Sequence, residues 1–200
     1  MEHHHPRIGK ARRLHRLALG LAAMAALMAP GTGVAGDDIA AARAAVKAFA
    51  GALKGELTAA LAAGGPEHAI AVCHDRAPAI AAEIGARTGF RLGRTALRLR
   101  NPANAPTPWQ RRVLDDFARR AAAGAPIATL EHSAVGLGKD GRREFRYMKA
   151  IPTGGLCLTC HGADVDPDLA ARIRALYPRD RAIGFAEGSL RGAFIAVRPL

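Results

Sequence analysis

Aromatic side chains are scarce in this chain of 200 residues, and their scarcity excludes one class of partner. Phe, Trp and Tyr together make up 4% of the residues, too few for the stacking platforms of proteins that bind single-stranded nucleic acid. The formal charge is +12, but the basic residues are scattered along the chain rather than gathered in one patch. We therefore expect no nucleic-acid partner, and the basic excess favours an acidic protein or ligand.

The chain also lacks an apolar run long enough to span a bilayer as a helix, which takes about 20 residues. The run Leu17 to Ala29 is shorter. It follows a basic stretch that begins at Arg7 and precedes small residues, which is the order of a secretory signal peptide. We predict that residues 1–36 are a leader, with His3 to His5 discarded in it. Residues 37–200 are then a single periplasmic domain with no stable membrane insertion. An uncleaved N-terminal anchor is the alternative.

Cysteines are few and odd in number: Cys73, Cys157 and Cys160. A disulfide between the last two would leave Cys73 as a reactive thiol in an oxidising compartment. The segment Cys157-Leu158-Thr159-Cys160-His161 instead has the spacing for covalent haem attachment, in which both thiols form thioethers and the histidine lies beneath the iron. The sequence therefore predicts one haem c, attached through Cys157 and Cys160, with His161 as the proximal ligand.

Two other interpretations of the paired cysteines lack the features that they need. A thioredoxin-like dithiol normally opens a helix after the strand of a βαβ unit, and the pattern shows no such unit. A zinc site needs a second compact cluster of ligands, for which only Cys73 and His74 are available. Both alternatives are therefore weaker than haem attachment.

Side chains able to serve as a sixth iron ligand are also few. Helical spacing places Cys73 on one stripe with Ala77, Ile80 and Ile84, and places His74 off that stripe. This favours Cys73 as the sixth ligand, although an inert buried thiol is a common alternative. The remaining candidates beyond the leader are Met148, which is the second choice, and His68, His74 and His132.

Apolar periodicity predicts a fold in which helices come first and strands with intervening helices follow. Such an order indicates an α+β domain with helices packed on a central antiparallel sheet. Pro78 is expected to kink or restart the second helix. The expected helices are residues 39–63, 67–88, 109–123 and 167–176, and the expected strands are residues 90–99, 127–132, 142–151 and 192–197.

Six segments occur in an order typical of one protein family: Cys73 to Pro78, Arg100 to Pro106, Trp109, Cys157 to Gly162, Tyr177 to Phe185, and Gly188 to Ala193. In these segments the chain resembles bacterial c-type haem proteins with a PAS-like α/β fold, found as exported proteins and as periplasmic sensor regions of histidine kinases. The resemblance implies a PAS-like central antiparallel sheet with N-terminal and flanking helices. It also implies Cys73 and His161 as axial ligands, and a sensing or redox role. Ser189 stands where an acidic residue is expected, which affects a local turn contact.

Ligation by a Cys73 thiolate would favour ferric iron and lower the reduction potential. On reduction the thiolate should protonate and leave, so we predict that the ferrous protein binds CO or NO. Arg100 and Arg191 are candidates to pair with the haem propionates, because a guanidinium matches carboxylate geometry. Ordinary solvated arginines are the alternative for both.

We therefore expect a redox or gas sensing haem module that acts on an unknown periplasmic redox or signalling protein. A periplasmic electron-transfer carrier is the alternative function. No distal His/Arg pair with a clear base is recognisable, and iron with six ligands is closed to substrate, so the sequence does not indicate an enzyme.

Overall fold

Four antiparallel strands form the central sheet, in the order β1-β4-β3-β2. The computed structural model describes residues 1–3 and 36–200, so nearly all of the predicted leader lies outside the described residues. The strands are β1 (Arg91–Thr95), β2 (Glu131–Leu137), β3 (Arg143–Pro152) and β4 (Leu190–Pro199). Successive side chains of a strand point to opposite faces. In β3, Tyr147 faces one hydrophobic cluster and Met148 faces another.

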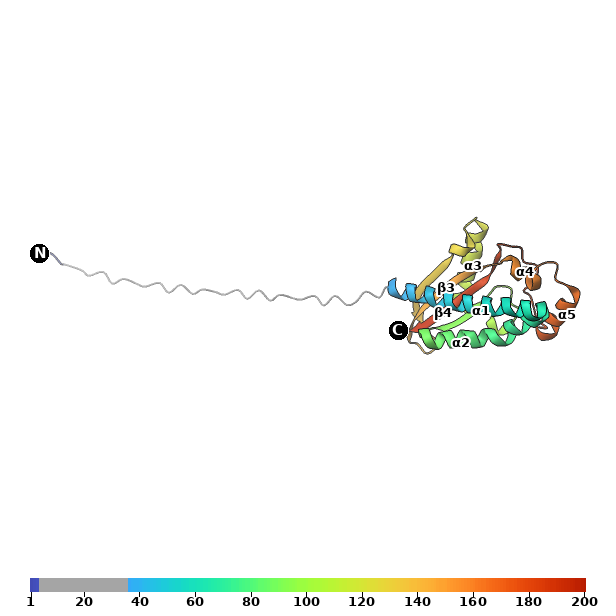
Figure 1. Cartoon of the computed structure of the whole chain (residues 1–200). Helices are drawn as coiled ribbons and strands as arrows, with labels where there is room; N and C mark the ends of the chain where they lie inside the picture. Colours follow the sequence, from blue (N-terminus) through green and yellow to red (C-terminus); the bar gives the residue numbers. More distant parts are fainter. Residues whose placement is uncertain (4–35) are drawn as a thin grey trace. The chain divides into compact units, whose positions relative to one another are not determined.

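One face of the sheet is covered by α1 (Gly36–Ala71) and α2 (Ala77–Thr88), which lie beside each other (Figure 1). Helix α1 is interrupted at Gly64 and Gly65, and Gly65 has φ +69° and ψ −166°, a conformation that is open essentially to glycine alone. Pro66 then restarts the helix, as a proline in a first turn can. The predicted helix break at these residues is present.

Between α1 and α2 the chain forms a widened, π-helical turn, η1 (Val72–Arg76). The backbone N–H of Ala77 donates to the carbonyl of Val72, five residues back. Pro78 has no N–H and cannot bond the carbonyl of His74, so the regular α-helical ladder is broken here. The kink expected at Pro78 thus takes the form of a π turn, which carries Cys73.

The opposite face is covered by α3 (Pro108–Ala122), which packs Val113, Leu114 and Phe117 against Met148. The side chain of Gln110 accepts the N–H of Thr107 at 2.8 Å and so caps the start of this helix. Two shorter helices, α4 (Gly155–His161) and α5 (Pro167–Leu176), lie at the end of the fold opposite the C-terminus (Figure 1).

The α+β fold with a central antiparallel sheet, an N-terminal helix and flanking helices is confirmed. The strand predicted at residues 127–132 is wrong in its first half. Ile127–Thr129 forms a 3-10 turn, η3, after Pro126, and β2 starts at Glu131. The N–H groups of Thr129 and Leu130 bond the carbonyls of Pro126 and Ile127 at 3.0 Å, so this backbone is satisfied locally rather than by a neighbouring strand.

The strand predicted at residues 90–99 is also shorter than expected. It ends at Thr95, the last residue that pairs with β4. Another short 3-10 turn, η2 (Pro102–Asn104), lies in the connection to α3. In the described part of the chain, no helix combines the length and the apolar character needed to cross a membrane.

Candidate functional site

Helix α4 presents the Cys-x-x-Cys-His segment on one of its faces. Cys157, Cys160 and His161 are three and four residues apart, a spacing that makes side chains neighbours on a helix. The helix ends at Gly162, whose N–H bonds the carbonyl of Leu158 at 2.8 Å. A Cβ at position 162 would lie 2.7 Å from that same oxygen, so this helix end requires glycine. All three functional side chains are half-buried.

The imidazole of His161 is held in one tautomer. Its Nδ1 lies 2.6 Å from the carbonyl oxygen of Ala182. A carbonyl can only accept, so Nδ1 carries the proton and the Nε2 lone pair is exposed to a ligand. Burial, followed by the charges of Arg191 and Arg100, lowers the pKa of His161 to about 3. The ring is therefore neutral at ordinary pH, which is the form that binds a metal.

Cys73, which lies on the π turn between α1 and α2, is near α4 although it is distant from it in sequence. Burial is the main cause that raises the pKa of the Cys160 thiol, and the nearby Cys73 raises it further. Cys73 also lines a cavity of about 670 Å³ between α2 and β1, with Pro78, Phe90 and Arg94 among its walls. Cys157, Cys160 and His161 are not among the residues that line this cavity. Cys73 is nevertheless close enough to Cys160 to affect the pKa of its thiol.

The other candidate sixth ligands are either exposed or buried on the other face of the sheet. Met148 is fully buried in the cluster with α3, on the face of the sheet opposite to the helices that carry Cys73. The imidazole of His74 pairs with the carboxylate of Asp75, and its side chain is 44% exposed. His68 and His132 are exposed. Among these candidates, Cys73 is the one that the fold places beside α4.

The two arginines predicted to bind propionates have different surroundings. The guanidinium of Arg100 pairs with the Asp180 carboxylate at 3.2 Å, and the two side chains are only 10% and 5% exposed. Arg191 forms no ion pair with any carboxylate in the described part of the chain. One of its nitrogens lies 3.5 Å from Nε2 of His161. Burial, followed by the charges of Arg100 and Arg94, lowers the pKa of Arg191 to about 10, so it stays charged. A buried cation therefore lies beside His161, with the centre of the Phe185 ring 5.1 Å from its guanidinium.

Sequence reasoning missed three contributors to this site: Arg94, which lines the Cys73 cavity, and the Asp180 and Ala182 pair that holds Arg100 and His161. Asp180 accepts the N–H of Ala182 at 2.8 Å, the local turn in which an aspartate bonds the backbone two residues on. That turn signal is present in the Tyr177 to Phe185 segment. Nothing local in the sequence indicates its contact with His161.

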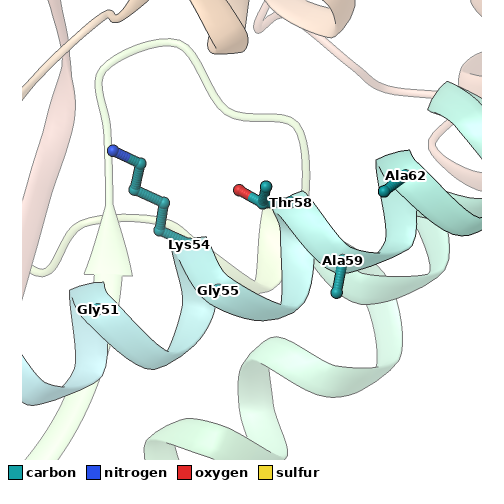
Figure 2. Close-up of a pocket in the computed structure, with 6 residues that line it drawn as sticks. All are labelled: Gly51, Lys54, Gly55, Thr58, Ala59 and Ala62. Carbon is teal, nitrogen blue, oxygen red and sulfur yellow. The ribbon is translucent and has the colours of Figure 1, made fainter.

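A second hollow lies on the exposed side of α1 (Figure 2). Its lining carries no thiol, imidazole or carboxylate and consists of Gly51, Lys54, Gly55, Thr58, Ala59 and Ala62. Across residues 1–3 and 36–200, no three His, Cys, Asp or Glu side chains gather closely enough to hold a metal ion. Iron in a porphyrin needs only one or two protein ligands, and the region around α4 offers them.

Comparison with known proteins gives one family and one solved structure. The model of the Tll0287-like family matches residues 15–199. The crystal structure of the cyanobacterial haem protein Tll0287 has the same fold, with a TM-score of 0.61 and 24% sequence identity. The alignment covers 83% of this chain and 97% of that one. No curated protein matches the chain.

Proposed function

Because this chain belongs to the Tll0287-like family, we propose that it is an exported c-type cytochrome with one haem, which senses redox state or a diatomic gas. The solved structure that shares its fold is that of a haem protein. In this proposal Cys157 and Cys160 would hold the haem through thioether bonds, and His161 and Cys73 would bind its iron.

The observation that carries the proposal is the hydrogen bond from Nδ1 of His161 to the carbonyl of Ala182. This bond fixes the tautomer and orients the ring, as second-shell partners do for histidines that bind metals. The neutral Nε2 is then available beside two thiols on the same helix face. Within residues 36–200 the sheet is antiparallel throughout, without the βαβ unit that a thioredoxin-like dithiol would need. The residues present therefore fit a covalently attached haem.

When bound, haem supplies an iron that exchanges single electrons and binds gases such as CO and NO. As a thiolate, Cys73 would favour the ferric state, and as a protonated thiol it would be a weaker iron ligand. Its place on the π turn η1 suits such a change, because a turn outside the regular helical ladder can change shape locally. Arg191, which lacks a carboxylate partner in the described residues, is the side chain that best suits a propionate.

An electron-transfer carrier is a second candidate, and one surface near α4 favours it. Leu156 on α4 and Ile183 are exposed, and the Arg98 side chain donates to the carbonyl of Arg181, two residues before Ile183. Exposed apolar side chains together with a nearby arginine suit an acidic redox partner. Slow ligand exchange with a strongly negative potential would support sensing. Fast electron exchange with a potential near that of periplasmic donors would support transfer.

The first test is whether the chain carries haem. The full chain is expressed with a working haem-ligation system, and the purified protein is denatured, stained for haem and weighed by mass spectrometry. We expect a coloured protein with the mass of the polypeptide plus one haem, and loss of haem retention in the Cys157→Ser/Cys160→Ser variant. A colourless wild-type protein with the mass of the bare polypeptide would refute the proposal.

The second test concerns the sixth ligand and the sensing role. Ferric low-spin iron with a thiolate ligand gives an EPR spectrum with a narrow spread of g values, which we expect in the wild type and not in Cys73→Ser. Met148→Leu, which nearly conserves volume in the core, is the matched control and should leave the spectrum unchanged. The ferrous wild type should bind CO, and a ferrous spectrum that CO does not alter would count against gas sensing.

A further inference from the structure

The carbonyl oxygen of Ala182 receives two donors from different parts of the fold. Nδ1 of His161 lies 2.6 Å from it, and a terminal nitrogen of Arg100 lies 3.4 Å from it. The same arginine donates to the carbonyl of Cys160, at the end of α4. Arg100 therefore touches both the haem-attachment helix and the backbone group that orients its histidine.

Asp180 completes this arrangement. One carboxylate oxygen accepts the N–H of Ala182 at 2.8 Å, and the other accepts from Nε of Arg100 at 3.2 Å. The aspartate thus fixes both the guanidinium and the peptide group beside it. A guanidinium fork that meets a carboxylate and two carbonyls has little freedom to turn.

The Arg100–Asp180 pair is nearly shielded from water, with side chains 10% and 5% exposed. Charges in such surroundings interact much more strongly than charges at the surface. Arg191 and Arg94 are further cations near this pair, and the charge of Asp180 also acts on Arg191. Asp180 forms its ion pair with Arg100.

We propose that the Arg100–Asp180 ion pair is a positioning device for the axial histidine. It holds the Ala182 carbonyl and the end of α4 so that the His161 imidazole has one orientation, and it sets the local charge at the iron. The inference rests on the proposed haem site. It gives Arg100 a role other than propionate binding.

Substitutions of Arg100 and of Asp180 should shift the midpoint potential of the haem in opposite directions. Arg100→Gln removes a cation, takes the ion-pair partner from Asp180, and leaves His161 as the one remaining side-chain donor to the Ala182 carbonyl. Each change stabilises ferric iron, so the potential should fall. Asp180→Asn leaves the Arg100 cation unbalanced, which disfavours ferric iron, so the potential should rise. A loosened site that merely admits water would lower the potential in both variants, because water favours the more highly charged ferric state.

The test is a spectroscopic redox titration and a ferric EPR spectrum of the haem-bearing full chain. Arg111→Gln and Asp115→Asn are matched controls, because this pair lies within α3, its side chains are exposed, and its nitrogen and oxygen are 3.1 Å apart. Opposite shifts in the two site variants, with both controls at the wild-type value, would support the proposal. Shifts of the same sign, or none, would overturn it.

Arg100→Lys is a second variant in case the others fail to accumulate, because it keeps the positive charge. A lysine cannot reach all three acceptors of Arg100 at once. Its potential should stay close to that of the wild type, and its EPR lines should broaden because the imidazole takes several orientations. Lines as sharp as those of the wild type would overturn the proposal.

A wild-type protein that carries no haem would refute the proposed function but not this arrangement. Nitrogen-15 NMR of that protein would then show whether Nδ1 of His161 holds the proton. The Arg100→Gln and Asp180→Asn variants should give a mixture of tautomers. An unchanged single tautomer in both variants would overturn the positioning role.

Discussion

Protonation of His161 should make the protein markedly less stable in mild acid. Its pKa is lowered from an ordinary 6.5 to about 3, mainly by burial. In the unfolded chain His161 is therefore protonated below about pH 6.5, whereas in the folded chain it stays neutral down to about pH 3. Stability from this group is fully present above pH 6.5 and is lost progressively as the pH falls towards 3.

Linkage gives the size of the loss. Each pH unit inside this window costs about 1.4 kcal/mol, so the step from pH 7 to pH 5 removes about 2 kcal/mol from the free energy of unfolding. A ligand on Nε2 would keep the proton off the folded state even more firmly and would leave the sign unchanged.

The measurement is the free energy of unfolding in urea, at pH 7 and at pH 5, for the wild type and for His161→Gln. The variant cannot take up this proton, so its stability should fall by about 2 kcal/mol less over the same step. Losses at carboxylates and at His132 are common to both proteins and cancel in the comparison. An equal pH dependence in the two proteins would refute a buried, neutral His161.

Three further predictions concern the framework around the site. Met148→Ala should cost about 2–5 kcal/mol of stability through a cavity beneath α3, yet leave the ferric EPR spectrum unchanged, and a changed spectrum would make Met148 a ligand. Tyr147→Phe should cost about 1.5 kcal/mol in urea unfolding, because the buried hydroxyl donates to Glu131 at 2.8 Å; no loss would show that the bond contributes nothing. Gly65→Ala should lower the melting temperature through about 1–3 kcal/mol of backbone strain at φ +69°. Gly55→Ala, in open space on the regular part of α1, should not lower it, and equal effects would refute the strain argument.

Local patterns in the sequence predict most of the elements of this fold. Helix α5 has the predicted bounds, and the long N-terminal helix breaks at its paired glycines as expected. Patterns are less informative where local bonding competes with pairing between strands. Residues 127–129 look like a strand, but their backbone is satisfied by a turn after Pro126, and apolar spacing alone does not separate the two outcomes.

Some residues of the candidate site can likewise be predicted from the sequence, and others cannot. The thiols and imidazole of α4 can be recognised from spacing, because a helix itself makes neighbours of residues three and four apart. The partners of His161 cannot be found by such a rule. Arg100 is 80 residues from Asp180, and Ala182 takes part only through its backbone carbonyl. A backbone acceptor has no residue signature, so only the fold reveals it.

The topology explains why residues so distant in sequence meet here. β1 and β4 are neighbours in the sheet, with Thr95 opposite Ala193. The connection after β1 and the segment before β4 therefore leave from the same end of the sheet. The first supplies Arg100 and the second supplies Asp180, and the N–H of Arg181 bonds the carbonyl of Leu99 at 2.7 Å to join them. Because α4 lies before the second segment, a haem attached to Cys157 and Cys160 would be held by two connections that the sheet has already fixed. This arrangement favours a site in which His161 has a fixed orientation. Cys73, on the π turn between α1 and α2, would then be the ligand that can move.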